Sequence, residues 1–360
     1  MIEDDISDGI DPAYFLQFVC SPEEYPRILR PKNADDFLLR VQADAITDHA
    51  RIFRVMQRRA IVKNLNTMLI DKNQRDFSQY LSYMPEFERL VCTDIPGRYI
   101  LTNNYDAMCL KSEFGKVIVV SEVLRYFLYY MNLGTLAVGD VPASVRSAAT
   151  LIAIRTLLLS EALDFDLDPR GMIPQEIHAT IEGFVDWQMK FIIGHEYAHH
   201  ILNHSSEETS YISSAKRFSD GDDLGEWVGY KRRHSEEFEA DAHSIIIAED
   251  KENRYSLFVG GTSFLLGLYV FEIIAGKIDP SFLEINTHPN TTTRYRKLIE
   301  KFECDETFMI DGVDRIIDFY ESIANDLLDH YQAHPDAFTR YGSMYLAEWR
   351  GPILKDRVDY

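Results

Sequence analysis

The stretch from residue 174 to residue 203 constrains the fold more than any other part of the sequence. Apolar residues recur in it at intervals of three and four, which predicts an amphipathic helix with one face in a core. They are Ile177, Ile181, Phe184, Val185, Ile192 and Ile193. Polar, titratable residues interrupt this helix at His195, Glu196 and His199. Gly194 directly precedes them, and its missing side chain lets another backbone approach closely at this point.

These three titratable residues form an HExxH motif. Residues four apart share a helix face, with Cβ atoms about 5–6 Å apart, so the imidazoles of His195 and His199 can reach one Zn²⁺. Zn²⁺ lowers the pKa of a bound water toward ~7, and a neighbouring carboxylate then accepts its proton as the water attacks a carbonyl. The motif therefore predicts two metal ligands, His195 and His199, and Glu196 as general base and then general acid.

A catalytic zinc also needs a third protein ligand and an open position. The metzincin pattern HExxHxxGxxH fails here, because Leu202 replaces the glycine and His204 falls one residue short. A second predicted helix offers three glutamates instead: Glu236, Glu237 and Glu239. Glu237 and Asp241 are four apart on one face, so one can bind metal while the other accepts the free ring N–H of a ligand histidine. Spacing alone does not decide among the three glutamates.

HEYAHHILNH at 195–204 followed by EFEAD at 237–241 resembles the zinc peptidase family that contains the CAAX prenyl endopeptidase and the bacterial membrane heat-shock protease. Members show HExxHxxxxH and then ExxAD some tens of residues later. The resemblance implies a gluzincin with Glu237 as third zinc ligand and Asp241 as the residue that orients a ligand. His200 and His204 are assigned no role, because they lie off the ligand face or beyond it.

Two flanking stretches extend the resemblance. Residues 103–124, which include GKVIVVSEVL, are similar to the family's strand and helix, where the strand forms the upper edge of the cleft and pairs with substrate backbone. Thr287-His288-Pro289 with Arg294 resembles the stretch after the glutamate helix. It implies His288 at the active site, either as a catalytic oxyanion stabiliser or as a structural anchor.

The resemblance covers residues 103–298, with two departures. The strand and the HExxH helix are much further apart than is usual in the family, and the family's membrane helices are missing apart from an apolar segment at 256–276. That segment carries one charge, Glu272, and we expect a buried core helix there, so contact with a membrane is not expected. A remote relative is implied, such as a phage-exclusion type of peptidase or an ImmA-like peptidase that cleaves one specific intracellular protein.

The predicted fold class is α+β and predominantly helical: a zincin-type core with a small sheet, an edge strand at 115–120, and helical additions at both ends. The corresponding division is a helical N-terminal region at 1–100, a metallopeptidase core at 101–300 and a C-terminal helical extension at 301–360. The polar stretch 205–234 between the ligand helices predicts either a lid-like insertion that gates the cleft or a disordered surface loop.

Composition limits the partners. The formal net charge of −21 repels phosphate backbones, so nucleic acid is excluded as a partner. The four cysteines lie far apart, and the N-terminal stretch lacks a signal-peptide pattern, so we expect a cytoplasmic protein.

We predict a zinc-dependent endopeptidase acting on a protein or peptide substrate. The alternative is a zinc-containing regulatory or interaction protein without turnover. Oligomeric state and physiological substrate are open.

Overall fold

The computed structural model describes residues 12–69, 75–102, 106–204, 207–211, 227–231, 234–280, 289–302 and 312–351. Six helices precede the first strand: α1 (Pro12–Val19), α2 (Tyr25–Leu29), α3 (Ala34–Asp48), α4 (Ala50–Val62), α5 (Arg75–Ser82) and α6 (Glu86–Thr93). The strands are β1 (Gly97–Ile100), β2 (Ala107–Ser112), β3 (Gly115–Ser121), β4 (Glu207–Tyr211) and β5 (Trp227–Lys231).

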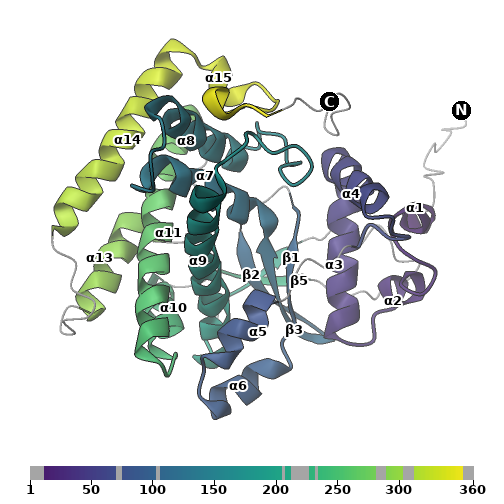
Figure 1. Cartoon of the computed structure of the whole chain (residues 1–360). Coiled ribbons are helices and arrows are strands. Elements are labelled where there is room, and N and C mark those ends of the chain that lie inside the picture. Colours follow the sequence, from purple (N-terminus) through teal and green to yellow (C-terminus); the bar gives the residue numbers. More distant parts are fainter. Residues whose placement is uncertain are drawn as a thin grey trace, which may run out of the picture.

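The remaining helices lie on the side of the sheet opposite α3 and α4 (Figure 1). They are α7 (Glu122–Thr135), α8 (Ala143–Leu157), α9 (Gln175–Ile201), α10 (His234–Ile246), α11 (Lys251–Ile278), α13 (Thr291–Phe302), α14 (Val313–Ala333), α15 (Asp336–Thr339) and the 3₁₀ turn η3 (Ala347–Trp349). The prediction of a predominantly helical α+β protein is confirmed.

The sheet has the strand order β1-β3-β2-β5-β4. The β-branched run Val117–Val120 of β3 is buried, as a pleated surface between two layers favours. β3 pairs in parallel with β1 and antiparallel with β2, so the prediction that residues 115–120 form an edge strand is wrong. The physical reason is β1, which forms in a stretch whose Pro, Gly and Asn residues suggest a turn. On its other side β2 pairs antiparallel with β5, with Lys111 opposite Val228.

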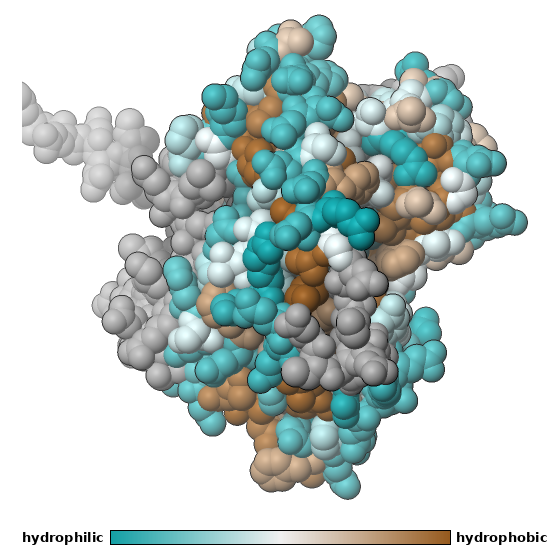
Figure 2. Space-filling model, turned by 90° about the vertical axis from the view of Figure 1, so that its left-hand side faces the viewer, coloured by the Kyte–Doolittle hydropathy of each residue, from teal (hydrophilic) through white to brown (hydrophobic). Residues whose placement is uncertain are grey.

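The N-terminal helices pack on the sheet and on α9, and one of their basic residues has a structural role. Arg59 of α4 is fully buried and contacts Glu122 at 3.2 Å and Asp166 at 2.8 Å. Its guanidinium therefore ties α4 to the start of α7 and to the α8–α9 connection. Phe87, Leu90 and Val91 on α6 stay exposed. Figure 2 shows apolar residues gathered at the lower end of the molecule, the level at which α6 lies in Figure 1.

Helix α11 contains the apolar segment 256–276. It is long and apolar enough to cross a membrane, and 67% of its apolar 18-residue window is buried inside the protein. A Cβ atom placed on Gly260 would lie 2.7 Å from the backbone carbonyl carbon of Trp187, so this glycine allows the backbones of α11 and α9 to meet. Close packing against α9 gives a structural reason for the apolar residues and the glycine of this helix.

The C-terminal segment is held to the α8–α9 connection by a buried ionic group, here named the anchor cluster: Arg155, Glu161, Asp164 and Arg170. Glu161 accepts hydrogen bonds from Arg155 at 2.8 Å and from Arg170 at 2.9 Å, and Arg170 also contacts Asp164 at 2.7 Å. The backbone N–H of Met344 donates to Glu161 as well, at 2.9 Å. One hydrophobic cluster includes residues from all three ranges of the predicted domain division, which itself stays a prediction.

Candidate active site

Helix α9 places the HExxH residues in the protein interior. It runs from Gln175 to Ile201, and its buried face continues through the motif. At Gly194 the nearest group is the side chain of Tyr80, with which any Cβ would overlap, whereas the sequence predicted the approach of a backbone. The Tyr80 hydroxyl donates to the carbonyl of Ser244 on α10 at 2.8 Å. Gly194 thus lets a buried tyrosine from α5 link the two helices that carry the site.

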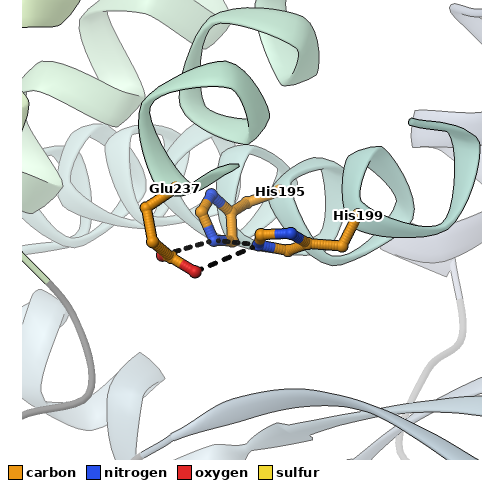
Figure 3. A group of neighbouring side chains, drawn as sticks. All are labelled: His195, His199 and Glu237. Carbon is orange, nitrogen blue, oxygen red and sulfur yellow. Dashed lines mark hydrogen bonds and ion pairs between the residues drawn. The ribbon is translucent and has the colours of Figure 1, made fainter. Parts of the chain in front are cut away.

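Three side chains converge where α9 and α10 meet (Figure 3): His195, His199 and Glu237. All three are buried, and one ligand atom from each lies within 4.8 Å of the others. The Nε2 atoms of the two histidines are 3.0 Å apart. The Glu237 carboxylate faces both, at 3.3 Å from His195 Nε2 and 3.4 Å from His199 Nε2.

This donor set fits a metal ion. Each histidine directs Nε2 at the same point and uses Nδ1 for a different contact, as a ligand histidine with a fixed tautomer does. Two imidazole nitrogens and one carboxylate are the protein ligands of many catalytic zinc sites, where a fourth position stays open. Of the three glutamates that spacing left open, Glu237 is the one that the structure brings to the histidines.

His195 is oriented by an ion pair. Its Nδ1 lies 2.9 Å from Asp241 Oδ1, and Arg294 of α13 donates to both oxygens of that carboxylate, at 2.8 and 2.6 Å. Burial disfavours the Asp241 carboxylate, but Arg294 and His195 outweigh this and lower its pKa to about 2. An ionised Asp241 holds the proton of His195 on Nδ1, which leaves Nε2 as the ligand atom.

The same carboxylates act on His195 itself. Burial disfavours the imidazolium, but the charges of Glu237 and Asp241 outweigh it and raise the pKa of His195 to about 9. Metal binding requires the neutral ring, so a cation entering the site displaces a proton.

The role of Arg294 was missed at the level of sequence, where it appeared only as part of a family-like stretch.

His204, which sequence reasoning left without a role, contacts His199. The two Nδ1 atoms lie 2.9 Å apart, and His204 Nε2 lies 3.3 Å from Glu239 on α10. The spacing HExxHxxxxH was the available signal. It could not be interpreted from helical periodicity, because α9 ends at Ile201 and the chain turns back before His204.

The other predicted residues are placed as follows. Glu196 is buried on α9, directly after the first ligand. His200 points elsewhere, with its Nδ1 2.5 Å from the ammonium group of Lys116 on β3. His288 lies outside the described residues, so its catalytic or anchoring role stays a prediction. Of residues 205–234, the structure describes β4, β5 and His234, and gating of the site by this stretch is untested.

Comparison with known proteins found one family. Residues 175–313 match the family model described as Peptidase U49. This range begins at the first residue of α9 and includes α10 and α13, so it contains both ligand helices and Arg294. No curated protein and no solved structure matches the chain. The match indicates a peptidase, and the His195–His199–Glu237 group could hold a metal ion. The closer relation to the CAAX prenyl endopeptidase family stays a prediction.

Proposed function

We propose that this protein is a zinc-dependent endopeptidase that hydrolyses peptide bonds of a protein substrate. The observation that carries the proposal is the convergence of His195, His199 and Glu237 from two helices, with Glu196 next to the first ligand. The Peptidase U49 match supports peptidase activity over the same residues. The net charge of −21 favours a protein partner over a nucleic acid.

Different residues of the chain bind the metal, transfer the proton and orient a ligand ring. His195, His199 and Glu237 would hold the metal, which when bound supplies a Lewis acid that polarises the scissile carbonyl and lowers the pKa of water. The Glu196 carboxylate accepts the proton of the attacking water and returns it to the leaving amine. Asp241 and Arg294 keep the His195 ring in the orientation that presents Nε2 to the site.

The decisive experiment measures metal content and peptide hydrolysis together. Wild-type protein should contain about one equivalent of zinc. Glu196→Gln should keep that zinc and lose about 10²–10⁴-fold in turnover, because a general base is removed. Glu237→Ala should lose the metal. Hydrolysis is followed on denatured casein by mass spectrometry of new N-termini, and Glu196→Gln then serves to trap physiological substrates.

Glu176→Gln is the matched control, since it makes the same change at an exposed position in the first turn of α9. It should alter neither zinc content nor turnover. Zinc well below one equivalent in the wild type would refute the metal site. Full zinc occupancy with equal hydrolysis by wild type and Glu196→Gln would refute the mechanism. Zinc without hydrolysis of any substrate would favour the regulatory alternative.

A further inference from the structure

We infer that His204 is a positioning residue for the metal ligand His199, and that a left-handed turn at Asn203 puts it in place. The inference rests on the proposed metal site. It concerns how the second histidine ligand is oriented, for which neither the HExxH motif nor the Peptidase U49 match provides a residue.

The end of α9 brings His204 back onto the helix. Asn203 has a φ of 49°, in the left-handed region. Its N–H donates to the carbonyl of His200 at 3.2 Å, and the N–H of His204 donates to the carbonyl of His199, also at 3.2 Å. These two bonds are those of a Schellman motif, in which the residue after the left-handed one folds back over the last turn. Asparagine is one of the few residues other than glycine that tolerates this backbone.

The side chains repeat the contact that the backbone makes. His204 Nδ1 lies 2.9 Å from His199 Nδ1, so one of the two nitrogens donates and the other accepts. If His199 presents the lone pair of Nε2 to the metal, its proton is on Nδ1 and His204 accepts it. The proton of His204 is then on Nε2, which faces Glu239 at 3.3 Å. Every hydrogen along this path points away from the metal, from His199 to His204 to Glu239.

The two ligand histidines therefore have different supports. His195 donates to a carboxylate that a guanidinium holds from two sides, whereas His199 donates to an imidazole whose own side chain is 7% exposed. A ligand histidine without its partner loses both its fixed tautomer and its ring orientation. Removal of His204 should therefore weaken metal binding through His199, without removing any ligand atom.

His200 provides a matched control. It is a histidine in the same last turn of α9, but its ring faces Lys116 on β3. His200→Ala removes the same group from the same helix end and leaves the ligand contact intact. A general effect of losing a helix-terminal histidine appears in both variants, and a positioning effect appears in His204→Ala alone.

The experiment is a competition titration of zinc between the full-length protein and a chromophoric chelator. His204→Ala should bind zinc about 10–100-fold more weakly than the wild type, the usual cost of losing such a partner. His204→Gln, whose amide oxygen can accept the His199 proton, should recover part of this loss. His200→Ala should stay within about 3-fold of the wild type, because the ligands keep their partners. The visible spectrum of the Co²⁺-loaded protein should shift in His204→Ala and not in His200→Ala.

Asn203 tests the turn without altering His204. Asn203→Gly keeps a residue that adopts positive φ and should retain wild-type zinc affinity. Asn203→Val places a β-branched residue where it is strained, so the turn opens and zinc affinity should fall by a factor similar to that of His204→Ala. Comparison of Asn203→Val with Asn203→Gly also tests the role of His204 if His204→Ala fails to fold.

Two results would overturn the inference: equal zinc affinities of His204→Ala and His200→Ala, or equal affinities of Asn203→Val and Asn203→Gly. Both results are distinct from failure of the proposed function, which appears in the wild-type protein itself, either as absence of zinc or as zinc without hydrolysis that depends on Glu196. Zinc binding by the wild type with no difference within either pair would leave the metal site standing and remove the role of His204.

Discussion

The active-site residues and the anchor cluster are two buried ionic groups that balance their charges differently. In the anchor cluster, Glu161 and Arg170 are fully buried, and Glu161 meets two guanidinium groups at 2.8 and 2.9 Å. The chain supplies both signs of charge there. Such a cluster needs nothing from solution, and its function is to fix the C-terminal segment against the α8–α9 connection.

At the active site part of the positive charge comes from a titratable ring, His195, whose pKa the neighbouring carboxylates raise to about 9. Asp241 is matched by Arg294 at 2.6 Å, but Glu237 faces two imidazoles at 3.3 and 3.4 Å, and Arg294 lies 4.0 Å from it. An added cation between Glu237 and the imidazoles would meet three ligand atoms that already point at one place. The comparison teaches that an ion cluster whose charges are all paired by protein groups stabilises the fold. A cluster in which an added cation would find ligand atoms is suited to binding a metal ion.

The largest effect on stability is expected at the anchor cluster. Arg170→Met leaves the carboxylates of Glu161 and Asp164 buried with one guanidinium fewer, and breaking such a pair costs about 3–5 kcal/mol of unfolding free energy. Urea denaturation measures this loss. Arg296→Met, at an exposed arginine, should cost no more than about 0.5 kcal/mol. Zinc affinity of the folded Arg170→Met protein should be unchanged, and a weaker affinity would contradict the separation of the two clusters.

A smaller loss of stability, joined to a loss of metal binding, is expected at Arg294. Arg294→Lys keeps the charge but loses the two-pronged contact with Asp241, which should cost about 1.5–3 kcal/mol. Zinc affinity should fall about 10-fold, because Asp241 then orients His195 less well. Arg296→Lys, on the same helix, is the control for both measurements. Lowered stability with unchanged zinc affinity would show that Arg294 stabilises the fold but does not orient the ligand His195.

The smallest effect is expected at a third, poorly matched pair. Arg40 Nε lies 3.9 Å from Asp44 on α3, and burial raises the pKa of Asp44 to about 7 against the attraction of Arg40. The unfolded chain ionises this group near pH 4, so the stability of the folded protein falls as the pH rises from about 4 to about 7.

Asp44→Asn removes the carboxylate whose ionisation lowers the stability of the folded protein as the pH rises. The variant should be more stable than the wild type by on the order of 2 kcal/mol at pH 8 and show little gain at pH 4. Thermal denaturation across this pH range measures the difference, with Asp35→Asn at an exposed position of the same helix as control. A gain that is equal at both pH values would show that Asp44 is ionised in the folded protein throughout.

The parts of the site that follow from local spacing could be predicted. His195 and His199 share a face because they are four residues apart on one helix, and Glu237 was favoured by the ExxAD resemblance. His204 and Arg294 could not be assigned in this way. The position of His204 depends on a left-handed backbone at Asn203, and that of Arg294 depends on how α13 packs against α10.

The sheet shows the same limit. The β-branched residues of β3 predict a strand, and the structure has a strand there. Its place in the sheet depends on whether another strand covers its outer edge, and β1 does so with a sequence that reads as a turn. Hydrophobic pattern identifies a strand but carries no information about its neighbours, because strands pair through backbone N–H and C=O groups that nearly all residue types share.

By itself, the sequence determined that this chain builds a long core helix with two histidines and a glutamate on it, and that an acidic second helix follows. Only the tertiary structure decided which glutamate meets the histidines, which groups orient them and which strands flank β3. Helical periodicity is a property of neighbours along the chain, so sequence records it directly. The contacts that complete the site join residues from α9, α10 and α13, and their geometry exists only once those helices are packed.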